Sequence, residues 1–149
     1  MKVEIISIEV SKCYPLRHKM LRKGKPLQTC HFDGDNSKGT FHLGALVDKE
    51  IIGIISIYEK ELSQFKNSKG AQFRGIAVAS KYQRKGVASK LINYAQKETI
   101  KRINPKYIWL NGRISANNLY LDRGFKPIGN PFEINTIGIH QRFIKMISG

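Results

Sequence analysis

A basic, glycine-containing loop joins an apolar segment to an amphipathic one near the middle of the chain. It comprises Gln83, Arg84, Lys85, Gly86, Val87 and Ala88. If a helix begins here, its first N–H groups have no partner within the helix, and the helix dipole is positive at this end. Gly86 would let the backbone approach a ligand closely, and the two basic side chains add full positive charge. The pattern therefore predicts a binding site for an anion such as a pyrophosphate.

Two other phosphate-binding motifs do not fit this loop. A Walker loop requires Gly-Lys-Ser/Thr after a four-residue gap, and a dinucleotide fingerprint requires GxGxxG. Neither pattern occurs at residues 83–88. Because Gln-x-x-Gly-x-Ala is short, an ordinary helix start beside a solvated basic loop remains the alternative interpretation.

The elements that would position this loop alternate between strands and helices. Apolar periodicity and turn residues predict strands over 3–10, 41–47, 50–59, 72–78, 107–110, 125–128 and 137–147, and helices over 11–21, 87–102 and 115–123. The polar segment from Lys23 to Thr40 is expected to be a long loop. Hairpins and crossover helices in one chain predict an α/β fold of the mixed α+β kind, with helices on both faces of a mixed sheet. The length suits a single domain over residues 1–149.

The chain is strongly basic, with 26 Lys and Arg against 11 Asp and Glu and a formal net charge of +15. Such a surface attracts polyanions, including nucleic acid and phosphorylated cofactors. However, Lys, Ile and Asn are enriched together, as an AT-rich genome would impose on any protein. Aromatic side chains are not interleaved with the basic ones as on a stacking platform. A nucleic-acid-binding module is therefore kept as an alternative function, and the charge alone does not decide it.

Composition excludes several other classes. No apolar run approaches the ~18–20 residues of a membrane helix, and the first residues lack the features of a signal segment. The two cysteines, Cys13 and Cys30, lack the spacing of a metal site. Asp33 and Asp35 beside His31 lack the EF-hand pattern, so a solvated loop is expected there. We therefore expect a cytoplasmic protein that binds no metal and no membrane.

Two separated motifs resemble the GNAT superfamily of N-acetyltransferases. The first is Arg/Gln-x-x-Gly-x-Gly/Ala after an apolar strand, and the second is Ala-x-x-x-Tyr on a small helix followed by Gly-Phe. The matching residues are Gln83, Gly86 and Ala88 for the first motif and Ala116, Tyr120, Gly124 and Phe125 for the second. Two motifs in the expected order are far more specific than either one alone.

Arg113 departs from the superfamily's commonest pattern, in which an asparagine precedes the tyrosine by seven residues. Arginine at this position resembles a bacterial subgroup of ElaA-like acyltransferases. Further matches to that subgroup are Leu21-Arg22, Gly24, Pro26, His42-Leu43-Gly44 and Ile137-Gly138-Ile139-His140. The resemblance covers nearly the whole chain, and it implies a three-layer α-β-α sandwich around a strongly twisted mixed sheet.

The resemblance implies acetyl-CoA as the acyl donor, bound between the splayed strands 72–78 and 107–110. Backbone groups of Ile76, Ala77 and Val78 would pair with the pantetheine arm. The pyrophosphate would be held by the N–H groups of Arg84, Lys85, Gly86, Val87, Ala88 and Ser89. Tyr120 matches the residue that protonates the leaving sulfur, and a tyrosine hydroxyl keeps its proton at neutral pH.

Several residues compete for the role of general base. His140 is the first candidate, because a neutral imidazole can accept a proton, and His42 is the second. Asp35 and Glu61 are weaker candidates, and proton loss through water without a single base also stays open.

The acceptor is expected to be a primary amine on a small molecule, a peptide or a protein, and a homodimer also stays open. We expect its site to be shaped by the 23–40 loop together with Arg22, His42, Arg74 and Arg113. A catalytically silent CoA-binding regulatory domain is a third hypothesis, which the presence of Tyr120 opposes.

Overall fold

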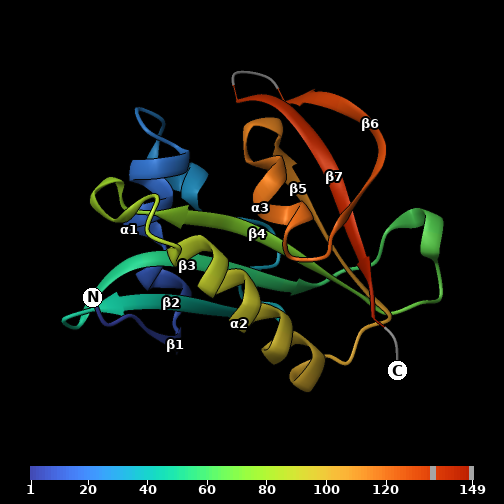
Figure 1. Ribbon diagram of the computed structural model, residues 1–149, viewed down its shortest axis with the longest axis horizontal. Helices are drawn as coiled ribbons and strands as arrows, with labels where there is room; N and C mark the ends of the chain where they lie inside the picture. The colour runs from blue at the N-terminus through green and yellow to red at the C-terminus, as the bar shows by residue number, and fades with distance from the viewer. Residues whose placement is uncertain (135–136, 148–149) are drawn as a thin grey trace.

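A seven-stranded sheet forms the centre of the computed structural model, which describes residues 1–134 and 137–147 (Figure 1). The strands lie in the order β1-β2-β3-β4-β5-β7-β6. Their bounds are β1 Glu4–Ile8, β2 Phe41–Val47, β3 Glu50–Glu59, β4 Gly70–Val78, β5 Tyr107–Arg113, β6 Lys126–Ile134 and β7 Gly138–Met146. β4 and β5 run parallel, whereas the other neighbouring pairs are antiparallel, so the sheet is mixed as expected.

Helices cover both faces of this sheet, so the three-layer prediction is confirmed. The helices are α1 Tyr14–Leu16, α2 Val87–Arg102 and α3 Asn117–Leu121. α2 packs Leu91 and Ile92 into the main core, which also holds Ile55 of β3. The segment around α1 packs Leu16 against Ile54 on the opposite face. In Figure 1, α2 and α3 lie in front of the sheet and α1 lies behind it. Because β3 is covered on both faces, its apolar run is nearly continuous.

The hairpin formed by β2 and β3 and the helix α2 occupy the predicted residues. Other segments differ from the prediction. β5 runs on to Arg113, and the helix expected at 115–123 is a 3-10 turn followed by the shorter α3. Residues 11–21 and β6 depart most. Residues 11–21 do not form one helix: a 3-10 turn at Val10–Lys12 precedes α1, and a π-helical turn follows at Arg17–Leu21. Pro15 has no N–H to donate, and at Arg17 the hydrogen-bond spacing lengthens, so that the Arg22 N–H donates to the Arg17 carbonyl over 2.9 Å.

β6 is longer than the predicted strand at 125–128. The pairing of β6 with β7 shifts between Ile128 and Phe132, and Gly129 there has a φ of 75°. The Gly-Asn-Pro stretch therefore forms a bulge within the strand and does not end it. Pro131 is tolerated because β6 lies at the edge of the sheet, where a missing N–H breaks no central ladder.

β4 and β5 separate partway along their length, and this separation positions the site. Their parallel register ends at Phe73 and Leu110. Immediately beyond, β4 contains a bulge opposite the β3 residues between Ile54 and Ser56. Gly75 lies in that bulge with a φ of 65°. A bulge bends and twists the strand that carries it, so β4 turns away from β5 here.

Candidate active site

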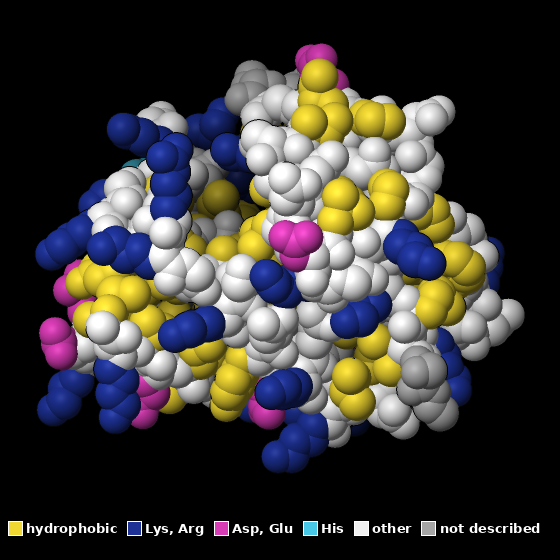
Figure 2. All heavy atoms as spheres, in the orientation of Figure 1, with side chains coloured by type: hydrophobic (Ala, Val, Ile, Leu, Met, Phe, Trp, Pro, Cys, Tyr) yellow, Lys and Arg dark blue, Asp and Glu magenta, His cyan; other side chains and the backbone are white. Residues whose placement is uncertain are grey.

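A cleft of about 730 Å³ opens where β4 and β5 separate. One wall is β4 from Gln72 to Val78, and the other is the end of β5 with α3. Figure 2 shows this hollow at the upper left, with an apolar floor and with Lys and Arg side chains around its opening. Many of the residues singled out from the sequence line it: Arg22, Arg74, Ile76, Ala77, Val78, Gln83, Arg84, Ala88, Arg113, Tyr120 and His140. The strand geometry thus brings together residues that lie far apart in the sequence.

The loop before α2 has the geometry of an anion site at one end of this cleft. α2 begins at Val87, and Gly86 before it has a φ of 81°, in the left-handed region. No side chain caps this helix end. A Cβ at position 86 would meet nothing within 4 Å, so the backbone here is open to a ligand. Arg84, Lys85 and Gly86 are exposed, and they surround the free N–H groups with positive charge.

Two residues of the loop support its shape. The Gln83 side-chain amide donates to the Val78 carbonyl over 3.0 Å, which ties the loop to the end of β4. Val87 is buried and belongs to the main core, so its contribution to a ligand is limited to its backbone. Ala77 and Val78 pair with β3 on one side, and Ile76 lies in the bulge before them. The other edge of these three residues faces the cleft beyond the last β5 partner.

Tyr120 lies on α3 at the opposite wall, with 6% of its surface exposed. Its ring packs against Phe143, with 5.3 Å between the ring centroids. A Cβ at Gly112 would collide with the Tyr120 ring, so glycine is needed in β5 at this point. Burial raises the pKa of Tyr120 to about 12, although the positive charge of Arg113 opposes the shift. The hydroxyl therefore retains its proton at neutral pH.

His140 lies on β7 beside the same part of the cleft, and its Cα pairs with that of Arg113 on β5. The Nδ1–H of His140 donates to the Gly138 carbonyl over 3.0 Å, and the ring stacks on Phe132. In this tautomer the other nitrogen, Nε2, carries the lone pair. Among the described residues nothing hydrogen-bonds to Nε2, so it is available to accept a proton.

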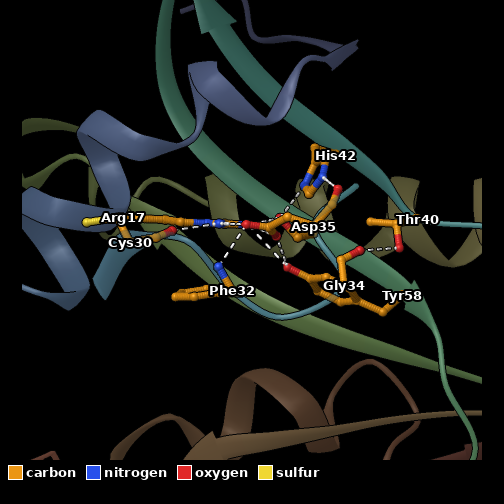
Figure 3. Close-up of polar contacts among 9 residues, drawn as sticks. Arg17, Cys30, Phe32, Gly34, Asp35, Thr40, His42 and Tyr58 are labelled. Carbon is orange, nitrogen blue, oxygen red and sulfur yellow. Dashed lines mark hydrogen bonds and ion pairs between the residues drawn. The ribbon is translucent and has the colours of Figure 1, made fainter. Parts of the chain in front are cut away.

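His42 lies outside the cleft, in a buried polar network (Figure 3). Its Nε2–H donates to the Asp35 carbonyl over 3.0 Å, and its Nδ1 accepts from the Ser56 hydroxyl at 2.7 Å. Burial lowers the pKa of His42, which keeps the ring neutral, although the bond to the Asp35 carbonyl opposes this shift. Since both ring nitrogens are used, the structure places His42 as a support for the 23–40 loop.

The centre of this network is an ion pair between Arg17 and Asp35, with a fully buried guanidinium. Two guanidinium nitrogens of Arg17 lie 2.7 and 3.0 Å from the Asp35 carboxylate oxygens. The Tyr58 hydroxyl and the Phe32 amide also donate to that carboxylate. Burial opposes ionisation of Asp35, but the hydrogen bonds from Arg17 and Tyr58 outweigh it and lower its pKa.

The expected solvated loop at residues 31–35 is therefore wrong for Asp35, and Arg17 is a residue that sequence reasoning missed. The pairing joins positions that are 18 apart across an irregular loop. No periodicity connects them. The only available signal was a pair of acidic residues, Asp33 and Asp35, within a polar segment of a strongly basic chain.

Comparisons with known proteins show which family this chain belongs to. A family model for the acetyltransferase (GNAT) domain matches residues 25–146. The chain belongs to the GNAT acetyltransferase family. It is therefore an acyltransferase, and the resemblance based on the 83–88 loop and the Tyr120 motif is confirmed at the level of family and fold.

One relative by sequence and two solved structures show how similar this chain is to other proteins. An uncharacterized N-acetyltransferase of Bacillus subtilis strain 168, YitI, is 29% identical over 138 residues, covering 93% of this chain and 92% of the relative. Escherichia coli ElaA superposes with a TM-score of 0.78 at 14% identity, covering 97% of this chain and 99% of that one. Arabidopsis thaliana NAA60, solved with acetyl-CoA, gives 0.76 at 14% identity, covering 99% and 100%. The two structures support the fold of this GNAT chain.

Within residues 1–134 and 137–147 of this GNAT chain, no helix is both long enough and apolar enough to span a membrane.

Proposed function

We propose that this chain transfers the acetyl group of acetyl-CoA directly to a primary amine. The observation that carries the proposal is the cleft between β4 and β5. At one end it meets the uncapped start of α2, and at the other it meets Tyr120 and His140. A pyrophosphate suits the first end and acid–base chemistry suits the second. A GNAT relative with the same fold, Arabidopsis NAA60, was solved with acetyl-CoA.

The residues of the cleft fit this donor. The unpaired edge of β4 at residues 76–78 offers backbone groups to an extended amide-bearing arm. The N–H groups of residues 84–89 would hold the pyrophosphate, with Arg84 and Lys85 adding charge. Gly86 would let the phosphate approach the backbone, since no side chain projects there.

Two side chains would move the protons of the reaction. His140 Nε2 would take a proton from the attacking amine as its nitrogen bonds to the thioester carbon. The carbon–sulfur bond then breaks, and the Tyr120 hydroxyl would supply its proton to the departing sulfur. The acetyl group thus passes from sulfur to nitrogen without an acyl-enzyme intermediate. Because its pKa is raised, the Tyr120 hydroxyl is fully protonated at neutral pH and can donate a hydrogen bond to the departing sulfur as negative charge builds there.

The test is the Tyr120→Phe variant in a transfer assay with a panel of primary amines. Free CoA thiol and acetylated amine are both measured. We expect kcat to fall by about a hundredfold or more, the usual contribution of a general acid, with acetyl-CoA affinity unchanged. Tyr94→Phe is the matched control, because Tyr94 is exposed on α2, and it should keep full activity.

An unchanged kcat in Tyr120→Phe would show that Tyr120 is not the general acid. Release of CoA without formation of an acetylated amine, for the whole panel, would contradict direct transfer to nitrogen.

A further inference from the structure

Three arginines converge on the part of the cleft that lies away from the α2 loop. Arg22 follows the π-helical turn, Arg74 precedes the bulge of β4, and Arg113 ends β5. All three line the cleft. They reach it from three different elements, so their proximity results from the fold and not from a run of charge in the sequence.

The charge of these arginines is not compensated within the described residues. No Asp or Glu lines the cleft there, and neither ion pair found in residues 1–134 and 137–147 involves Arg22, Arg74 or Arg113. Burial lowers the pKa of Arg22, and the charges of Arg74 and Arg113 lower it further. Three like charges held this close, with no acidic partner, favour an anion between them.

An aromatic platform holds two of the three in place. The guanidinium carbons of Arg74 and Arg22 lie 4.6 and 5.1 Å from the centre of the Phe32 ring. Phe32 is itself fixed, because its N–H donates to Asp35 over 2.8 Å and Arg17 stacks on its ring at 4.0 Å. Stacking restrains a guanidinium while leaving its N–H edge available to an oxyanion. One nitrogen of Arg22 also donates to the Leu21 carbonyl over 3.0 Å, and its remaining N–H groups stay available.

We propose that the acceptor amine carries an anionic group, and that Arg22, Arg74 and Arg113 bind this group while the amine faces Tyr120 and His140. The inference rests on the proposed function, since it concerns the acceptor of the same reaction. The shared chemistry is an oxyanion, either a carboxylate or a phosphate, on a small primary amine. Because these arginines repel cations, polyamines are expected to be poor acceptors.

Matched pairs of acceptors test the proposal with the wild-type chain and saturating acetyl-CoA. Short ω-amino acids are each compared with the amino alcohol of the same chain length, and glucosamine 6-phosphate is compared with glucosamine. The expected result is a kcat/KM about tenfold to a hundredfold higher for the anionic member of at least one pair, as charge-assisted hydrogen bonds provide. The first set of pairs reports on a carboxylate and the second on a phosphate.

Variants identify the side chains responsible. Arg74→Gln and Arg113→Gln should each remove most of the preference for the anionic acceptor, so that the ratio of kcat/KM within each pair falls toward one, while acetyl-CoA affinity is unchanged. Lys97→Gln is the control, because Lys97 is exposed on α2 and lies outside the cleft. It removes the same charge and should leave the preference for the anionic acceptor unchanged.

Equal rates within every pair, a preference for the neutral member, or no turnover of any pair while acetyl-CoA binds would overturn the proposal. Loss of acetyl-CoA affinity in the arginine variants would instead assign these arginines to the donor. Failure of the wild-type chain to bind acetyl-CoA would overturn the proposed function itself, so the two failures are distinguishable.

Discussion

Packing, and not hydrogen bonding, orients Tyr120. Its ring rests on the backbone of Gly112 and against Phe143, and no described residue hydrogen-bonds to its hydroxyl. The hydroxyl at the end of a fixed ring can therefore engage a ligand in the cleft without first breaking a bond to the protein. In His140, Nδ1–H donates a hydrogen bond to the Gly138 carbonyl, and no described residue hydrogen-bonds to Nε2.

The assignment of His140 as base predicts the effect of His140→Gln. The amide can still donate to the Gly138 carbonyl, so the strand should keep its shape, but it cannot accept the proton. We expect kcat/KM to fall by about a hundredfold, within the usual range for a general base, with acetyl-CoA affinity unchanged.

His31→Gln is the control, because His31 is exposed and lies outside the cleft. Full activity in His140→Gln would show that the amine loses its proton through water, the alternative that the sequence left open.

The sequence singled out individual residues where a local motif has fixed internal spacing. Gly86 and Tyr120 were chosen in this way, and the structure places Gly86 immediately before α2 and Tyr120 in the wall of the cleft. Arg17 and Gly112 were not found, because each matters through a partner that only the fold brings near, Asp35 for the first and Tyr120 for the second. Long-range contacts of this kind leave no trace in spacing.

At the scale of elements, periodic segments were predicted well. The bounds of β2, β3 and α2 agree with the prediction, since their apolar pattern alone determines them. The prediction was wrong where the backbone departs from regular helix or strand geometry. These places are the π-helical turn after α1 and the bulge at Gly129 of β6. The bulge at Gly75 was likewise not predicted, although it turns β4 away from β5 and so opens the cleft.

The Arg17–Asp35 ion pair joins the 23–40 loop to the π-helical turn, and hydrogen bonds to Ser56 and Tyr58 connect the pair to β3. Its loss should therefore weaken the fold and the acceptor site together. In Asp35→Asn the buried guanidinium keeps its charge but loses its anionic partner. We expect the free energy of unfolding at pH 7 to fall by about 3–5 kcal/mol. Because the pKa of Asp35 is lowered in the fold, its stabilisation is complete above the ordinary value of 3.8 and is lost as the pH falls below it.

Urea unfolding across this pH range measures the effect. Asp33→Asn is the matched control, because Asp33 is exposed in the same loop and its removal should leave the stability unchanged. Equal stabilities for the two variants at pH 7 would contradict the role assigned to the ion pair.

At the scale of the whole molecule, the structure shows where part of the net charge of +15 lies on the surface. Some of it surrounds the opening of the cleft, where Figure 2 shows Lys and Arg side chains around an apolar floor. A site of this kind would attract both the proposed donor, which carries several phosphates, and the proposed anionic acceptor from a distance. Composition alone could not distinguish this local role from a general bias toward lysine, because composition carries no position.

The central claim is that the cleft between β4 and β5 binds acetyl-CoA, and thermal unfolding tests it most directly. The melting temperature is measured at physiological salt with acetyl-CoA, and with ATP as a polyanion control. Ligand at about 100 times its dissociation constant adds ~2.7 kcal/mol of stability, or about 5–10 °C for a chain of this size. We predict this rise for acetyl-CoA, a much smaller one for ATP, and none in Gly86→Glu, which places a charged side chain where the phosphate would lie. No rise with acetyl-CoA, or an equal rise with ATP, would contradict the claim and leave residues 83–88 as a basic helix start.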